Sequence, residues 1–172
     1  MSSSDAARET DTRTEATRRI PAEPADVFAV LCDPQGHVAI DATGMLQDAT
    51  GSPVTAEGDT FVVHMDREAL GDRPMGRYDV EVTIRSFVPD REISWSIIGT
   101  VKPGIGHVFG YELEPAPVSD GGGTRVTSYC DWSEAREDWK HVFPIVTTTA
   151  LRGTLGILDR TVRRGYPRAS GS

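Results

Sequence analysis

Between Gly44 and Trp132 the chain alternates apolar and polar residues with a period of two, and this pattern constrains the fold more than any other feature. One example is the run from Tyr78 to Ile84, where every second residue is apolar and the residues between them are polar or charged. Turn-forming stretches interrupt the alternation at TGSP, LGDRPMG, VPDR, VKPGIG and VSDGGGT. The segment therefore predicts a meander of antiparallel hairpins with one buried face and one solvated face.

The same alternation assigns the inward-facing side chains of the other strands. The inward sets are Tyr78, Val80, Val82 and Ile84; Ile93, Trp95 and Ile97; His107, Phe109, Tyr111 and Leu113; and Val126, Ser128, Cys130 and Trp132. In FVVHMD both parities are partly apolar, and Phe61, Val63 and Met65 are taken as the inward set, which places His64 and Asp66 outside.

Helices are predicted before and after the meander. PAEPADVFAVLCDP predicts a short helix that opens near Pro24 and stops before Pro34, and GHVAID a second short one. A long helix is predicted from about Pro144 to Arg164, ending at Gly165, and it is expected to cover the apolar face of the whole sheet. The helical spacing begins before Pro144 and places Trp139, Phe143, Val146, Ala150, Gly153 and Ile157 along one face, so Pro144 either opens the main helix at its first turn or kinks it. Gly153 and Gly156 each cost about 1 kcal/mol inside a helix, which indicates either close packing or room for a ligand.

Length and charge limit the function classes. A chain of 172 residues with 38% hydrophobic content is expected to form one domain, here residues 11–166 between disordered tails at 1–10 and 167–172. A net charge of −8 argues against a nucleic-acid partner. Cys32 and Cys130 are far apart and no secretory leader is recognised, so we expect free thiols and a cytoplasmic location. No apolar run reaches the length of a membrane span.

Several sequence segments of the chain resemble segments typical of the START-like (SRPBCC) superfamily. They are PADVFAVLCDP, FVPDREISW, YELEP, GGGTRVTSYCDWS and LRGTLGILDRTVRRG, and DPQGHVAIDATG is similar to a phrase of the bacterial polyketide cyclase/dehydrase-like branch. The resemblance implies an α+β helix-grip fold, in which a curved antiparallel sheet wraps around a long C-terminal helix, with two short helices after the first strand. It also implies a deep pocket between sheet and helix for lipids, sterols, polyketides or other apolar or aromatic molecules. It supplies no catalytic residue set, because that set differs between branches.

His37 and Asp41 form the first candidate dyad. Their order along a helix opposes the macrodipole, so helix stabilisation is a poor explanation for the pair. In the resembled fold this segment borders the pocket mouth, where an imidazole oriented by a carboxylate could transfer a proton. The structural alternative is that Asp41 binds the backbone of the following ATG turn while His37 lies at the surface.

The second candidate group lies on the inward faces of neighbouring strands. His107 and Tyr111 could polarise a ketone and manage an enolate proton, as cyclisation and dehydration of a poly-carbonyl chain require. The alternative is that inward tyrosines fill the core and bond a backbone partner. The expected ligand-contacting residues are Tyr78, Trp95, Phe109, Val82, Trp139, Phe143 and Val146.

Other sites are not supported by the sequence. His64 and Asp66 lack a third ligand at metal-site spacing, and the glycines of PGIGHVFG miss the nucleotide-binding pattern, so neither metal nor cofactor is expected. The leading interpretation is a bacterial protein that binds a small hydrophobic or aromatic molecule, as a cofactor-free cyclase, aromatase or dehydratase if it is an enzyme (a lyase or an isomerase). The alternative is a non-catalytic carrier or sensor. A protein-interaction adaptor would need an exposed apolar patch, which the outward residues do not favour. A homodimer is compatible with all three.

Overall fold

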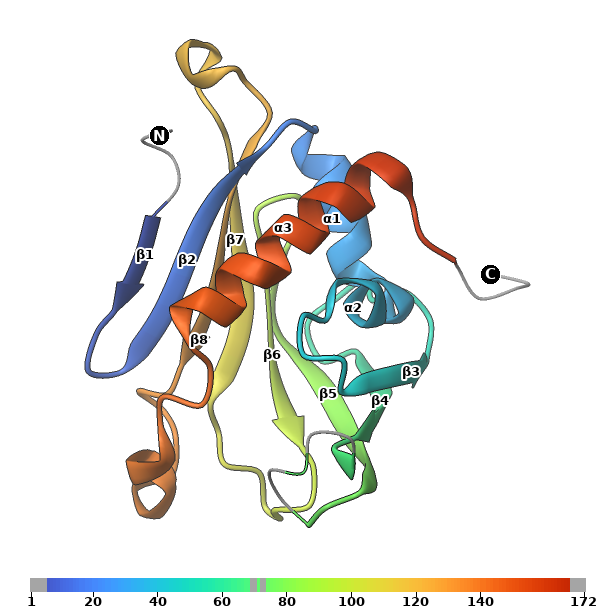
Figure 1. Ribbon diagram of the computed structural model, residues 1–172, viewed down its shortest axis with the longest axis vertical. Helices are drawn as coiled ribbons and strands as arrows, with labels where there is room; N and C mark the ends of the chain where they lie inside the picture. The colour runs from blue at the N-terminus through green and yellow to red at the C-terminus, as the bar shows by residue number, and fades with distance from the viewer. Residues whose placement is uncertain (1–5, 69–70, 72–73, 168–172) are drawn as a thin grey trace.

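Residues 6–68, 71 and 74–167 are described by the computed structural model, and their strands form one antiparallel sheet (Figure 1). The sheet has eight strands in the order β1-β2-β8-β7-β6-β5-β4-β3. The strands are β1 (Ala6–Glu9), β2 (Arg13–Ile20), β3 (Leu46–Thr50), β4 (Thr60–Asp66), β5 (Arg77–Val88), β6 (Glu92–Ile98), β7 (Val108–Pro115) and β8 (Thr124–Asp131). The predicted meander is confirmed, because β3 to β8 pair in chain order and β2 then pairs with β8.

The helices also follow the predicted order, and together they make the α+β helix-grip architecture. They are α1 (Pro24–Cys32), α2 (Pro34–Ile40) and α3 (Thr148–Arg164), with 3-10 helices η2 (Val118–Asp120) and η3 (Glu137–Val142). Figure 1 shows the red α3 crossing the face of the sheet, with α1 and α2 beside its C-terminal half. No helix among the described residues is long and apolar enough to cross a membrane.

Alternation places the predicted inward side chains in the core. Val80, Val82 and Ile84 of β5 are buried, as are Val126, Ser128 and Cys130 of β8 with Trp132 just beyond it. Phe61 and Val63 of β4 are buried, so their parity was assigned correctly. Three residues that alternation places on the outward face, Ser94, Gly110 and Tyr129, are buried all the same.

Tyr129 points outward from β8 and was expected to be solvated, but it is only 6% exposed. It lies over Gly110 of β7, where a Cβ would collide with the tyrosine ring. The guanidinium of Arg13 covers the other side of the ring, 3.9 Å from its centroid. The missing side chain at Gly110 therefore lets an outer-face tyrosine become buried.

Helix α3 begins later than predicted. Pro144 lies before the helix, which starts at Thr148 because the side chain of Thr147 accepts a hydrogen bond from the amide of Ala150 at 3.0 Å. Trp139 belongs to η3, and Phe143 and Val146 lie between η3 and α3, so these residues do not share a face of the long helix. The predicted end is confirmed, since Gly165 caps α3.

Helix α3 packs mainly on β2, with further contacts to β1 and β8, and not over the whole sheet as predicted. An ion-pair cluster fixes it there. Asp159 of α3 is 3% exposed; its carboxylate accepts from Arg18 of β2 at 2.9 and 3.0 Å and from Arg163 at 2.8 Å. The cluster joins the C-terminal helix to a strand near the start of the chain.

The chain end before β2 differs from the predicted tail over 1–10. Ala6–Glu9 forms the edge strand β1, paired antiparallel with β2. Residues 1–5 and 168–172 of the predicted tails lie outside the described residues, and Pro167 has no regular secondary structure.

Candidate functional site

Aromatic side chains from α2, β6, β7 and the segments before β7 and α3 form a connected layer on the inner face of the sheet. We call this set the aromatic layer: His37, Trp95, His107, Phe109, Tyr111 and Phe143. Trp95 is its centre, with ring centroids 5.9 Å from Tyr111, 6.3 Å from Phe109 and 4.8 Å from His37. His107 continues the layer, 5.2 Å from Phe109 and 5.1 Å from Phe143. Six of the eleven site residues predicted from the sequence are thereby brought together.

Strand register explains this arrangement. Trp95 of β6 lies directly opposite Phe109 of β7, and Tyr111 is two residues further along the same face of β7. Side chains two apart on a strand point the same way. The sequence alternation was therefore sufficient to place them on one surface.

His107 is the most unusual polar group of the layer. It is 3% exposed, and neither ring nitrogen has a hydrogen-bond partner among the described residues. Burial lowers the pKa of His107 to about 4, so the ring is neutral at neutral pH. A neutral imidazole still has one donor and one acceptor, and leaving both unsatisfied in an apolar setting costs free energy.

A second unpartnered group lies on the same side of the sheet. The hydroxyl of Thr14 on β2 is buried without a partner among the described residues. Thr14 is opposite Cys130, and Cys130 is opposite Phe109, so one row of inward residues leads from Thr14 to the aromatic layer. Sequence reasoning missed Thr14, because only its burial and its lack of a partner distinguish it from other strand threonines.

Tyr111 is 4% exposed and lies directly opposite Ser128 on β8. Burial, with a smaller contribution from the charge of Asp41, raises the pKa of Tyr111 to about 12. The hydroxyl therefore stays protonated and acts through hydrogen bonds.

His37 and Asp41 bond different partners. The Nε2 atom of His37 lies 2.8 Å from the carbonyl oxygen of Leu31 and must carry the proton, because a carbonyl only accepts. Asp41 accepts from the amide and hydroxyl of Thr43 and from the amide of Leu46, at 2.7 to 3.0 Å. His37 is buried, which lowers its pKa. Asp41 thus has the turn contacts that the structural alternative anticipated, while His37 lies in the core and not at the surface.

The remaining predicted contact residues lie at different depths. Val82 is buried in the main core, and Tyr78 is half-buried against it. Val146 packs between the main core and the smaller cluster around Trp132. Trp139 is half-buried in η3 and belongs to neither cluster. The structure therefore does not place Trp139 with the other candidates.

Part of the inner face is accessible beside α3. The inward side chains of β4, β5 and β6 include several that are only half-buried, because α3 packs mainly on β2 at the other side of the sheet. These half-buried residues are Met65, Tyr78, Trp95 and Ile97. Trp95 belongs to the aromatic layer, Ile97 lies two residues further along the same face of β6, and Met65 and Tyr78 are paired across β4 and β5. Together they give the inner face an apolar surface that solvent reaches.

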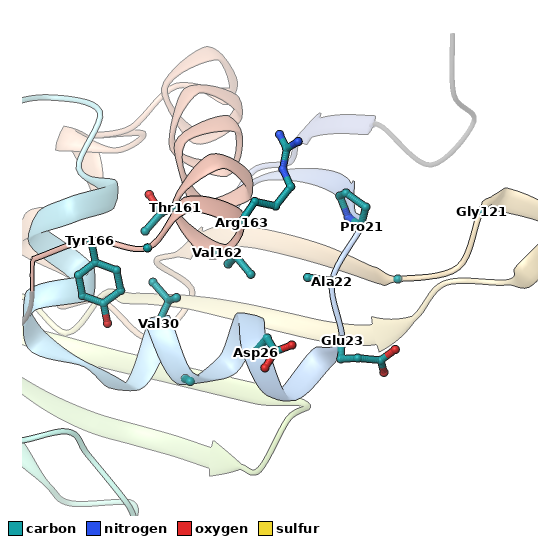
Figure 2. Close-up of a pocket in the computed structure, with 13 residues that line it drawn as sticks. Pro21, Ala22, Glu23, Asp26, Val30, Gly121, Thr161, Val162, Arg163 and Tyr166 are labelled. Atoms are coloured by element: carbon teal, nitrogen blue, oxygen red, sulfur yellow. The ribbon is translucent and has the colours of Figure 1, made fainter.

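An open groove of about 620 Å³ lies elsewhere, between α1, the end of α3 and the turn after β2 (Figure 2). Val162 and Tyr166 face Val30 and Asp26 of α1 across it. The hydroxyl of Tyr166 donates to the carboxylate of Asp33 at 2.6 Å, which fixes the segment after α3 against the α1–α2 junction. None of the predicted site residues lines this groove.

Charged clusters on the outer face do not resemble metal sites. Among residues 6–68, 71 and 74–167, no group of three or more His, Cys, Asp or Glu side chains could hold a metal ion. His64 lies on the outer face and bonds Asp79, not Asp66.

Comparisons with known proteins support the architecture. The chain matches no protein-family model and no curated protein. A structural-genomics protein from Rhodobacter sphaeroides superposes with a TM-score of 0.66 at 17% identity, covering 94% of this chain and 99% of that one. The Aha1 dimer from Colwellia psychrerythraea superposes with a TM-score of 0.57 at 16% identity, covering 90% of this chain and 98% of that one. The AHSA1-like protein from Aeromonas hydrophila superposes with a TM-score of 0.56 at 14% identity, covering 91% of this chain and 99% of that one. Over nearly its whole length, the chain therefore has the helix-grip fold that these proteins share.

Proposed function

We propose that this protein binds a small, uncharged, apolar or aromatic molecule against the aromatic layer, with His107 hydrogen-bonded to a hydroxyl or carbonyl of that molecule. The observation that carries the proposal is the buried His107 ring, both of whose nitrogens lack a partner among the described residues. A ligand that supplies one hydrogen-bonding group would relieve that cost. Trp95 and Phe109, both half-buried, would provide the flat apolar wall.

The ligand is expected to be uncharged at the end that meets His107. The rings that contact His107, those of Phe109 and Phe143, offer no compensation for a buried charge. A neutral imidazole can donate to a carbonyl or accept from a hydroxyl, so both kinds of group are compatible.

The catalytic version is a cofactor-free cyclase, aromatase or dehydratase of polyketide-like carbonyl compounds, with His107 or His37 as acid or base. Its difficulty is electrostatic. A base whose pKa is about 4 removes protons weakly at neutral pH, and His37 already bonds the Leu31 carbonyl. We therefore favour a carrier or sensor, located in the cytoplasm, over an enzyme.

The binding test uses naphthol and naphthalene, which differ by one hydroxyl group, in calorimetric titrations. We expect naphthol to bind more tightly, and His107→Phe to weaken naphthol binding about five- to tenfold, the value of one hydrogen bond, while leaving naphthalene almost unaffected. His141→Phe is the matched control, because His141 is exposed on η3. Failure of both compounds to bind would refute the proposal, and equal losses for both would remove His107 as the polar contact.

The enzymatic version is tested with a synthetic poly-β-carbonyl thioester. His107→Phe, Tyr111→Phe and His37→Phe should then abolish product formation while the compound still binds. If the wild-type chain binds it without forming product, the carrier assignment stands.

A further inference from the structure

Three side chains on the outer face, from neighbouring strands, form a hydrogen-bonded chain away from the aromatic layer. Nδ1 of His64 on β4 lies 2.8 Å from Oδ1 of Asp79 on β5. Nε2 of the same ring lies 2.7 Å from the hydroxyl oxygen of Thr50 on β3. Register produces this arrangement, because His64 is directly opposite Asp79 and Thr50 is opposite Val62, two residues before His64.

The partners fix the tautomer of His64. A carboxylate only accepts, so Nδ1 carries the proton that it donates to Asp79. In the neutral ring Nε2 then has the lone pair and accepts the hydroxyl proton of Thr50. Carboxylate, imidazole and hydroxyl are thus ordered as in the Ser-His-Asp triad, with the hydroxyl directed at the base.

We propose that Thr50, His64 and Asp79 form an acyl-transfer site that accepts small activated esters. Oγ1 of Thr50 attacks the acyl carbon and forms a new C–O bond, while Nε2 of His64 takes the hydroxyl proton. The ester C–O bond breaks and the leaving group departs as a phenolate, while the protonated His64 releases its proton to solvent and becomes neutral again. In the second half, Nε2 of His64 takes a proton from a water molecule whose oxygen attacks the acyl carbon. The acyl C–O bond to Thr50 then breaks, Oγ1 of Thr50 takes that proton back from His64, and the carboxylic acid is released. Asp79 is a positioning residue, since it touches only the ring.

Exposure determines the substrate class. Thr50 is exposed, and the side chains of His64 and Asp79 are 39% and 69% exposed, so substrate reaches the hydroxyl directly. The same exposure keeps the site wet, where electrostatic stabilisation of an oxyanion is weak. The site therefore suits esters whose leaving group is a stable anion, such as aryl esters. The proposal is independent of ligand binding at the aromatic layer.

The test incubates the full chain with p-nitrophenyl acetate, follows p-nitrophenolate release, and maps acetylated residues by peptide mass spectrometry. We expect an acetyl ester on Thr50, removable by hydroxylamine, at a rate about 100-fold above Thr60, the low end of the range for a positioned base. Thr60 is the matched control hydroxyl. It is exposed on the outer face of β4, and it has no hydrogen bond to a histidine of the described residues.

Variants separate this proposal from background acetylation. Thr50→Val and His64→Gln should each reduce the rate of p-nitrophenolate release by at least about tenfold, which is less than the full effect of a positioned general base. Thr60→Val and His141→Gln should leave that rate unchanged. Thr50→Ser should retain acetylation at position 50. Asp79→Asn should slow the acetylation of Thr50, and Asp79→Glu should retain part of the wild-type acetylation rate. An acetyl group found equally on Thr60 and Thr50, or on His64 alone, or release unaffected by Thr50→Val, would overturn the proposal.

Discussion

Replacing Gly156 by alanine should stabilise the protein. Gly156 is inside α3, and apart from the backbone of its own helix a Cβ built there meets no heavy atom of the described residues within 4 Å. The substitution therefore brings no collision, and it removes the backbone freedom that glycine has in the unfolded chain. The gain expected for alanine over glycine in a helix interior is about 1 kcal/mol. For a domain of this size that corresponds to a rise in Tm of about 2 to 4 °C.

Urea unfolding followed by circular dichroism measures the change, with Gly110→Ala as the contrasting variant. A Cβ at Gly110 would collide with the ring of Tyr129, so that variant should lose stability. Loss of stability in Gly156→Ala would refute the reasoning. Unchanged binding of naphthol in Gly156→Ala would also show that the glycine is not kept for the ligand, one of the two reasons that the sequence suggested.

Three further predictions concern buried polar groups. Asp159→Asn should lower the free energy of unfolding, measured in urea, by about 1 to 2 kcal/mol. The loss is smaller than for a fully buried ion pair, because the side chains of Arg18 and Arg163 are 39% and 57% exposed and can be hydrated once the carboxylate is gone. Stability should fall as the pH is lowered from 6.5 to about 4, since the unfolded chain protonates His107 in that range and the folded chain resists. Unfolding curves at neutral pH and midway through that range should show His107→Phe to be less acid-sensitive than wild type; equal sensitivity would contradict the lowered pKa. Tyr166→Phe leaves the Asp33 carboxylate one donor short, and thermal unfolding should show a loss of about 1 kcal/mol; an unchanged Tm would mean that this contact contributes nothing.

The sheet could be predicted from the sequence because its signal is local. Alternation along β5 and β8 depends only on whether a residue faces the core, and that repeats every second position. The same alternation is sufficient to place His107, Phe109 and Tyr111 on one face of β7 and the residue before it. The burial of Tyr129 could not be predicted from alternation, because it depends on the missing side chain of Gly110 on the neighbouring strand.

Helical spacing was misleading before α3. Trp139, Phe143 and Val146 recur at intervals that suit a helix, but the chain there forms η3 and an irregular segment, and the Thr147 cap sets the true start. Such a competition between a hydrophobic period and a capping residue is decided by tertiary packing. The apolar period alone therefore gave a helix one turn too long.

The hydrogen-bond partners of individual side chains could not be predicted from sequence patterns. The spacing of His37 and Asp41 suggested a pair, yet the nearby Leu31 carbonyl and the turn after Asp41 offered better partners. The Thr50, His64 and Asp79 chain depends on the register of three strands. That His107 has no hydrogen-bond partner within the described part of the chain likewise follows only from the packed structure.

Hydrogen bonding of a ligand to His107 is tested most directly by the chemical shifts of the His107 ring nitrogens, measured by NMR while naphthol is added. We expect a His107 nitrogen to shift as naphthol saturates the protein, naphthalene to cause a smaller shift, and His64 and His141 not to respond. Naphthol binding that leaves the His107 nitrogens unchanged, or no binding at all, would contradict the proposal.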